Sequence, residues 1–226
     1  MSVSTRQVTL GLATVVAAGI GCSGLATAAA KPGPTIRTDR GCYSVGKKVK
    51  ITGTGFTPAQ AYEVAVDGID FGQATTTGAG EFASSLIPGG LGAGQAQLVH
   101  HLNVSDGTSD AAATFTVTRS KPGARFLAGG GDVRTLKAPL EAWGFSRTGS
   151  RPSAYLHYVA PSGHVNRTVS LGRAGGQCGY LRTGKLRVFP FSPSGGTWTL
   201  QIDTRRRYAK RPGGPVARIS VQIHKA

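Results

Sequence analysis

The residues best suited to chemistry in this sequence are arginines and lysines. The densest group is Arg205–Arg211, with the sequence Arg-Arg-Arg-Tyr-Ala-Lys-Arg, and Pro-Gly-Gly follows it. Arginine dominates, and its planar guanidinium suits bidentate contacts with phosphate or carboxylate groups. We therefore predict a polyanion-binding surface formed by Arg182, Lys185, Arg187, Arg205, Arg206, Arg207, Lys210 and Arg211.

The class of polyanion follows from the aromatic content beside this charge. Nucleic-acid platforms usually place several exposed aromatic rings next to the cations, whereas here only Tyr208 is adjacent. An anionic cell-envelope polymer or an acidic partner protein is therefore favoured over nucleic acid. The alternative is that these loops belong to a generally basic secreted protein and are merely solvated.

The groups that an enzyme would need are largely missing. The chain has five histidines, namely His100, His101, His157, His164 and His224. His100 and His101 are adjacent in an expected strand and must point to opposite faces, and His157 alternates with apolar neighbours as a structural histidine does. After residue 30 the chain contains neither a nucleophile elbow nor a phosphate-loop pattern. We expect no catalytic residue and no cofactor.

Acidic residues are too scarce and too dispersed for a paired-carboxylate or metal site. Residues 120–226 contain only Asp132, Glu141 and Asp203, and their spacing indicates no convergent pair. Earlier pairs such as Asp67 with Asp70 and Asp106 with Asp110 do not resemble a calcium-binding loop, so we interpret them as turn residues. The absence of a C-x-x-C pattern argues against zinc, and we expect no metal.

The charge is divided unequally along the chain. The 226 residues carry a formal net charge of +16. Residues 31–119 hold seven basic and seven acidic residues, whereas residues 120–226 hold eighteen basic and three acidic residues, a net charge of +15. All the candidate binding residues belong to the second segment.

The elements that must position these residues are strands. Val49 and Ile51 alternate with polar residues, as do Trp198, Leu200 and Ile202, which is the pattern of half-buried strands. Similar alternation covers residues 113–118 and 217–223, and glycine-containing turns separate the runs. With 34 glycines and no sustained helical period, the chain is predicted to be all-β, as two tandem Ig-like, Greek-key β-sandwich domains after a signal peptide.

The predicted domains are residues 31–119, which are neutral, and residues 124–226, which are strongly basic. A Ser-Lys-Pro-Gly linker at residues 120–123 separates them. An internal repeat supports the division, because Gly55-Phe56 corresponds to Gly144-Phe145, and the run starting at Ala61-Tyr62 corresponds to that starting at Ala154-Tyr155.

The N-terminus is predicted to be a signal peptide covering residues 1–30. An uncharged stretch from Val8 to Gly21 is too short to span a membrane, and small residues follow it where cleavage would occur. Lipidation of Cys22 is disfavoured, since Gly19 stands where lipoprotein signals carry Leu or Val. We expect a secreted or cell-wall-associated protein without a transmembrane segment in the mature chain.

Secretion bears on the two cysteines that remain. Cys42 and Cys178 fall in different predicted domains, so an oxidising compartment allows one bridge between the domains. Two free thiols are the alternative, because spacing alone does not bring the Cα atoms within reach.

Several motifs together resemble the bacterial Ig-like modules of secreted actinobacterial proteins. They include Gly41-Cys42-Tyr43-Ser44-Val45-Gly46 and Val64-Ala65-Val66-Asp67-Gly68 in the first segment, and Phe189-Pro190-Phe191 and Gly196-Thr197-Trp198 in the second. The resemblance covers most of residues 35–226. It implies a fold and an extracytoplasmic setting, and it implies no reaction.

Two functions stay open at this point. The first is a non-catalytic secreted or cell-envelope protein whose basic segment contacts anionic polymers or an acidic partner. The second is an accessory or inhibitory module of a secreted enzyme, or a divergent enzyme without a recognisable site.

Overall fold

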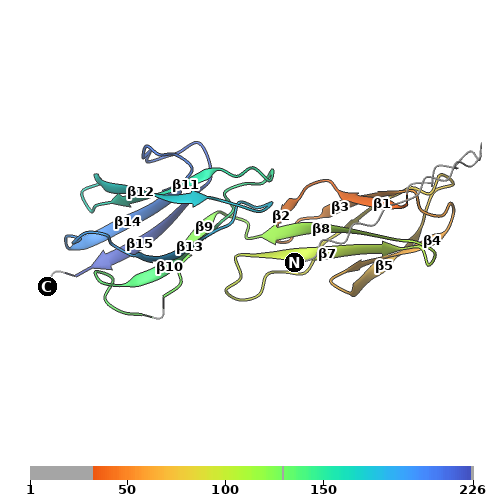
Figure 1. Ribbon diagram of the computed structural model, residues 1–226, viewed down its shortest axis with the longest axis horizontal. Helices are drawn as coiled ribbons and strands as arrows, with labels where there is room; N and C mark the ends of the chain where they lie inside the picture. The colour runs from red at the N-terminus through yellow and green to blue at the C-terminus, as the bar shows by residue number, and fades with distance from the viewer. Residues whose placement is uncertain (1–32, 129, 225–226) are drawn as a thin grey trace, which may run out of the picture. The chain divides into compact units, whose positions relative to one another are not determined.

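Alternating apolar and polar residues give this chain strands throughout the part that can be described. The computed structural model describes residues 33–128 and 130–224, so the predicted signal peptide, residues 1–30 with Cys22, lies outside the described residues. The regular secondary structure of the described part consists of strands alone, which confirms the all-β prediction (Figure 1). None of these residues forms a helix of the length and apolar character that crossing a membrane requires.

The first half of the described chain forms two sheets around one core. Its strands are β1 (Thr35–Thr38), β2 (Cys42–Ser44), β3 (Val49–Thr54), β4 (Ala61–Val66), β5 (Ile69–Thr75), β6 (Phe82–Leu86), β7 (Gln97–Ser105) and β8 (Asp110–Thr118). They are ordered β1-β3-β6 in one sheet and β2-β8-β7-β4-β5 in the other. Val49 and Ile51 are buried in the core between the sheets, as predicted.

The second half repeats this arrangement around a separate core. Its strands are β9 (Gly123–Phe126), β10 (Lys137–Trp143), β11 (Ser153–Val159), β12 (Val165–Arg173), β13 (Leu181–Arg187), β14 (Gly196–Asp203) and β15 (Val216–Ile223). The sheets have the orders β13-β10-β9 and β12-β11-β14-β15. Trp198, Leu200 and Ile202 of β14 are buried in this core, as their alternation predicted.

The two halves share one strand order. The sheet β1-β3-β6 matches β9-β10-β13, and β5-β4-β7-β8 matches β12-β11-β14-β15, with β2 as an additional strand that pairs parallel to β8. The predicted Gly-Phe equivalence holds in detail. Gly55 and Gly144 have φ angles of 81° and 79°, and a Cβ on either glycine would contact a proline, Pro34 or Pro122.

The second predicted equivalence is wrong by one residue. Tyr62 of β4 is buried in the first core, whereas Tyr155 of β11 lies on the outer face of its sheet, and Ala154 is the buried residue. Because side chains alternate along a strand, a shift of one residue moves them all to the other face. The sequence comparison matched Tyr62 with Tyr155 because the residue types are identical. The directions of the side chains instead match Tyr62 with Ala154.

One covalent bond joins segments of the two halves. Cys42 of β2 and Cys178, which precedes β13, form a disulfide with their Cα atoms 5.2 Å apart and a sequence separation of 136 positions. The described residues of both halves belong to one compact unit. The predicted linker at residues 120–123 follows the end of β8 at Thr118, and its last residue, Gly123, already belongs to β9.

Candidate polyanion-binding surface

The arginine-rich segment lies in the connection between two neighbouring antiparallel strands. β14 and β15 pair from Gly196↔Ile223 to Asp203↔Val216, so residues 204–215 form the hairpin loop. We call this segment the basic loop. It does not extend freely into solvent, because it folds over the outer face of the sheet that contains β11 and β14.

Three polar residues of that outer face show that it is covered. Leu156 and Tyr158 point into the core, so His157 between them points outward, and Gln201 and Asp203 alternate in the same way with Leu200 and Ile202. Polar residues at such positions normally face water. His157, Gln201 and Asp203 are instead 0% exposed, because the basic loop lies above them.

Side chains of the sheet hold the main chain of the basic loop at three points. The Asp203 carboxylate accepts the amide N–H of Arg205 at 2.8 Å. Gln201 Nε2 donates to the carbonyl oxygen of Ala209 at 2.9 Å, and Arg218 Nη2 donates to that of Lys210 at 2.7 Å. A loop held in this way loses less conformational entropy when it binds a ligand than a free loop would.

His157 acts as part of this support and has no access to a substrate. Its Nε2 lies 3.1 Å from the carbonyl oxygen of Arg205 and 3.4 Å from Asp203 Oδ1, and its Nδ1 lies 2.9 Å from Thr168 Oγ1. Since a carbonyl oxygen only accepts, Nε2 carries a proton. The ring of Tyr208 packs edge-on against the imidazole at 5.7 Å.

The charged side chains of the basic loop remain in water above this support. Arg205, Arg206, Arg207, Lys210 and Arg211 are all exposed. Beside the loop lies an open groove of about 540 Å³, which is lined by Val159, Ala160, Pro161, Gly163, Thr197, Thr199, Tyr208, Lys210, Arg211 and Arg218. Three of these lining residues are cations and none is a carboxylate, so the groove continues the positive surface of the loop.

The structure separates the other predicted cations from the basic loop. Arg182, Lys185 and Arg187 are exposed on β13, which belongs to the opposite sheet. Leu181 and Leu186 of the same strand face the core, so the three cations point away from it on the outer face of that sheet. The eight predicted residues therefore form two groups on opposite faces, and only the group in the basic loop adjoins the groove.

Burial of acidic residues strengthens the positive surface of this half. Glu141 is buried and accepts hydrogen bonds from Arg125 Nε and the Tyr180 hydroxyl, both at 2.7 Å. Burial, together with the nearby Glu141 carboxylate, raises the pKa of Tyr180 above its usual value, so the phenol stays protonated and donates. Asp203 is also buried, which leaves Asp132 as the one exposed carboxylate among described residues 120–128 and 130–224.

Of the acidic residues interpreted as turn residues, Asp67 and Asp106 lie in connections between strands, whereas Asp70 and Asp110 belong to strands β5 and β8. Asp106 accepts hydrogen bonds from the backbone amides of Thr57, Thr108 and Ser109, and Asp67 accepts from His100 and from the amide of His101. In the part of the chain that the structure describes, no three His, Cys, Asp or Glu side chains gather as a metal site would require.

Sequence reasoning located the basic loop and missed what supports it. His157 lies far in the chain from Gln201 and Asp203, and in sequence each of the three resembles an ordinary outward-facing strand residue. Their burial depends on a loop that folds back over the sheet. The only available signal was the coincidence of three polar residues on two strands that pair, His157↔Gln201 and Tyr155↔Asp203.

No family model and no curated protein matches this chain. Among solved structures, a beta-glycosidase from Bacteroides vulgatus is similar with a TM-score of 0.29 and 10% identity, over 85% of this chain and 25% of that chain. Red sea bream transglutaminase is similar with a TM-score of 0.30 and 9% identity, over 88% of this chain and 32% of that chain. The chain thus spans about a quarter to a third of these proteins, and likenesses this distant carry no functional argument.

Proposed function

We propose that this is a non-catalytic secreted or cell-envelope protein that binds anionic polymers through the basic loop and the adjoining groove. The observation that carries the proposal is the contrast within residues 204–215. Their main chain is held by the buried side chains of His157, Gln201 and Asp203, while their cationic side chains are exposed. A folded, solvent-facing array of guanidinium groups is suited to phosphate and carboxylate groups spaced along a polymer.

Two further observations support a polymer as the ligand. The positive surface runs from the loop into a groove of about 540 Å³, so a flexible chain has a path along which several anionic groups find cations. With Glu141 and Asp203 buried, little negative charge on this half opposes an approaching polyanion. The arrangement of charge also fits an acidic partner protein, and a binding experiment separates the two ligands.

The experiment compares the full chain with two variants that lose equal charge. In the first, Arg205, Arg206, Arg207 and Arg211 are all changed to Gln, which leaves the main-chain hydrogen bonds of the loop in place. The matched control carries Lys137→Gln, Arg182→Gln, Lys185→Gln and Arg187→Gln on the opposite sheet. Lys137 of β10 lies opposite Arg187 of β13 in the strand register, so the four residues belong to neighbouring strands. Binding to immobilised poly(glycerol phosphate) and to polyglutamate is measured across a salt series.

We expect the loop variant to lose at least about tenfold in affinity, since charge-assisted hydrogen bonds contribute roughly 1.5–3 kcal/mol each. The slope of log affinity against log salt should also fall by about three for this variant. The control should keep most of the binding. Equal losses in the two variants would contradict a specific surface, and so would the absence of binding at low salt.

A further inference from the structure

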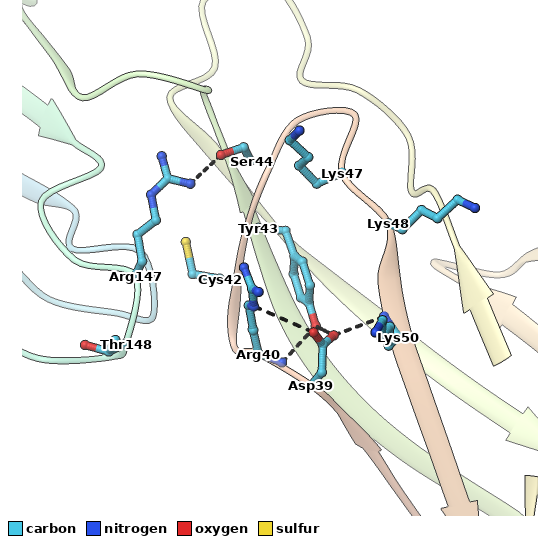
Figure 2. A pocket seen from close by; sticks show the side chains of 10 residues that line it. All are labelled: Asp39, Arg40, Cys42, Tyr43, Ser44, Lys47, Lys48, Lys50, Arg147 and Thr148. Carbon is cyan, nitrogen blue, oxygen red and sulfur yellow. Dashed lines mark hydrogen bonds and ion pairs between the residues drawn. The ribbon is translucent and has the colours of Figure 1, made fainter. Parts of the chain in front are cut away.

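The cations of the electrically neutral first half are concentrated around one groove. The groove has a volume of about 570 Å³, and Figure 2 shows that its walls come from residues 39–50 and from the loop after β10. Its lining residues are Asp39, Arg40, Cys42, Tyr43, Ser44, Lys47, Lys48, Lys50, Arg147 and Thr148. Five of these ten are lysine or arginine and one is a carboxylate. We call it the junction groove, because both halves contribute to it.

The single carboxylate of the junction groove is engaged by neighbouring donors. Asp39 Oδ1 accepts the Tyr43 hydroxyl at 2.7 Å and the amide N–H of Lys50 at 3.0 Å, and Oδ2 lies 3.6 Å from Arg40 Nε (Figure 2). The Tyr43 hydrogen bond holds the pKa of Asp39 below its usual value. One fixed negative charge therefore faces five positive ones, and the groove keeps a net positive charge.

Arg147 is oriented across the junction by two hydrogen bonds. One terminal nitrogen donates to the Ser44 hydroxyl (Figure 2), and the other donates to the Ser120 carbonyl oxygen at 3.1 Å. A guanidinium has five N–H donors, so three remain for a ligand. The Cys42–Cys178 disulfide joins the same two halves, and Cys42 itself lines the groove.

The lysines of the junction groove have no competing partner. Among residues 33–128 and 130–224, Arg40 and Arg125 are the only lysines or arginines in an ion pair with a carboxylate. Lys47 and Lys48 are exposed, and their ammonium groups make no hydrogen bond with the described part of the protein. Figure 2 shows Lys48 directed away from Arg147, so Lys47 and Arg40 are the cations best placed to act with Arg147.

We propose that the junction groove is a second anion-binding site, which takes a phosphate-type oxyanion between Arg40, Lys47 and Arg147. A tetrahedral oxyanion presents several acceptors to donors from different directions, and arginine supplies two parallel donors to it. The volume of the groove falls within the range of pockets that hold small ligands. This site is independent of the basic loop, and it requires both halves of the molecule.

The test is a titration of the full chain with pyrophosphate by calorimetry at low ionic strength. Arg147→Gln removes oriented donors, and we expect it to weaken pyrophosphate binding by at least about tenfold. Because this change also removes the bonds to Ser44 and Ser120, Lys47→Gln is the second variant, since it removes a charge and no internal contact. It should weaken binding about fivefold, the effect of one charge at close range in water.

Two controls separate this site from the basic loop. Arg187→Gln on β13 removes the same charge from another surface and should leave the titration unchanged. The fourfold loop variant should bind pyrophosphate normally even where it no longer binds polymer, so the two proposals can fail separately. If the loop variant loses pyrophosphate binding while Arg147→Gln and Lys47→Gln keep it, or if the unmodified chain does not bind, the inference is overturned.

A second ligand series identifies the source of the oxyanion. Inorganic phosphate, pyrophosphate and a short poly(glycerol phosphate) are titrated in turn into the fourfold loop variant. A higher affinity for the polymer per phosphate group assigns the groove to a polymer-borne phosphate, and equal or lower affinity assigns it to free phosphate. Failure of all three ligands overturns the inference as well.

Discussion

The two halves of this protein have the same strand order but differ in one hairpin connection. In the first half, β7 and β8 are joined by residues 106–109, after the last pair Ser105↔Asp110. In the second half, β14 and β15 are joined by residues 204–215, after the corresponding pair Asp203↔Val216. The first connection is a tight turn held by Asp106, and the second is the basic loop.

The sheet beneath each connection differs accordingly. The outer-face positions Ala65, Asn103 and Ser105 of the first half stay accessible to water, whereas His157, Gln201 and Asp203 of the second half are fully buried. A shared scaffold thus acquires a cationic surface through a longer loop and the polar side chains that hold it. The core residues take no part in that difference, since both cores are built from aliphatic and aromatic side chains.

The largest effect is expected from separating the two halves. Changing Cys42 and Cys178 to Ala removes a bridge between residues 136 positions apart in sequence, and we expect a loss of about 2–5 kcal/mol in the free energy of unfolding. Both tryptophans, Trp143 and Trp198, belong to the second half, so their fluorescence follows that half alone, while circular dichroism follows both.

In guanidinium titrations, the two signals should change together in the bridged protein and at different denaturant concentrations in the variant. Coincident transitions in both proteins would contradict the view that each half has a self-sufficient core. The reduced and alkylated wild-type chain provides the control for the substitutions.

A smaller effect is expected from the support beneath the basic loop. Asp203→Ala removes the acceptor of the Arg205 amide and one of the partners of the buried His157 and Gln201 side chains, and should cost about 2–4 kcal/mol in the free energy of unfolding. The matched change in the first half, Ser105→Ala, should cost no more than about 0.5 kcal/mol, because its position is only half-buried.

Trypsin provides a local measurement of the same comparison. The basic loop is rich in cleavage sites, and we expect Asp203→Ala to speed cleavage between Arg205 and Arg211 while Ser105→Ala leaves it unchanged. Rapid cleavage of the unmodified protein at these sites would show that the loop is not held as described.

The smallest expected effect is a loss of stability of the first half at acidic pH. Hydrogen bonds from the amide of Thr57 and the hydroxyl of Thr108, with others from the same turn, hold the pKa of Asp106 far below its usual value. A carboxyl with a lowered pKa in the folded state stabilises the fold at pH values above the unfolded pKa, roughly 3.9, and loses that contribution as the pH falls further. Stability of the first half should therefore decline below about pH 4.

Urea unfolding at neutral pH and near pH 3 tests this for the wild type and Asp106→Asn. The variant should have a lower free energy of unfolding than the wild type at neutral pH, and this free energy should fall less on acidification. An unchanged pH dependence in the variant would assign the acid sensitivity to other carboxylates, of which Asp39 and Asp67 also have lowered pKa values.

The pattern of alternation predicted several of the strands, and local information was sufficient for them. Val49 and Ile51, or Leu200 and Ile202, differ from their neighbours in polarity, and that difference alone assigns them to a buried face. The repeat was harder to place, since Ala61-Tyr62 and Ala154-Tyr155 share letters but not side-chain directions. Identity of residue type does not determine which face of a sheet a residue occupies.

The composition of the candidate sites could not be predicted from sequence spacing, because it depends on contacts between residues that are distant in the chain. The predicted cations were divided between two faces, because β13 and the β14–β15 loop belong to opposite sheets. Lys47 and Arg147 line the same junction groove although they belong to different halves. Counting the net charge of each segment separately did not reveal this cluster of cations. A sum of zero over residues 31–119 is compatible with cations gathered at one place and carboxylates at another.

The burial of Glu141 and Asp203 has a consequence for how the second half responds to its surroundings. Exposed carboxylates and histidines are the groups that let a protein surface change its charge between mildly acidic and neutral conditions. This surface has few of them among the described residues, with Asp132, His164 and His224 exposed, and most of its charge is carried by arginine. The reach of that charge is therefore governed mainly by dissolved salt.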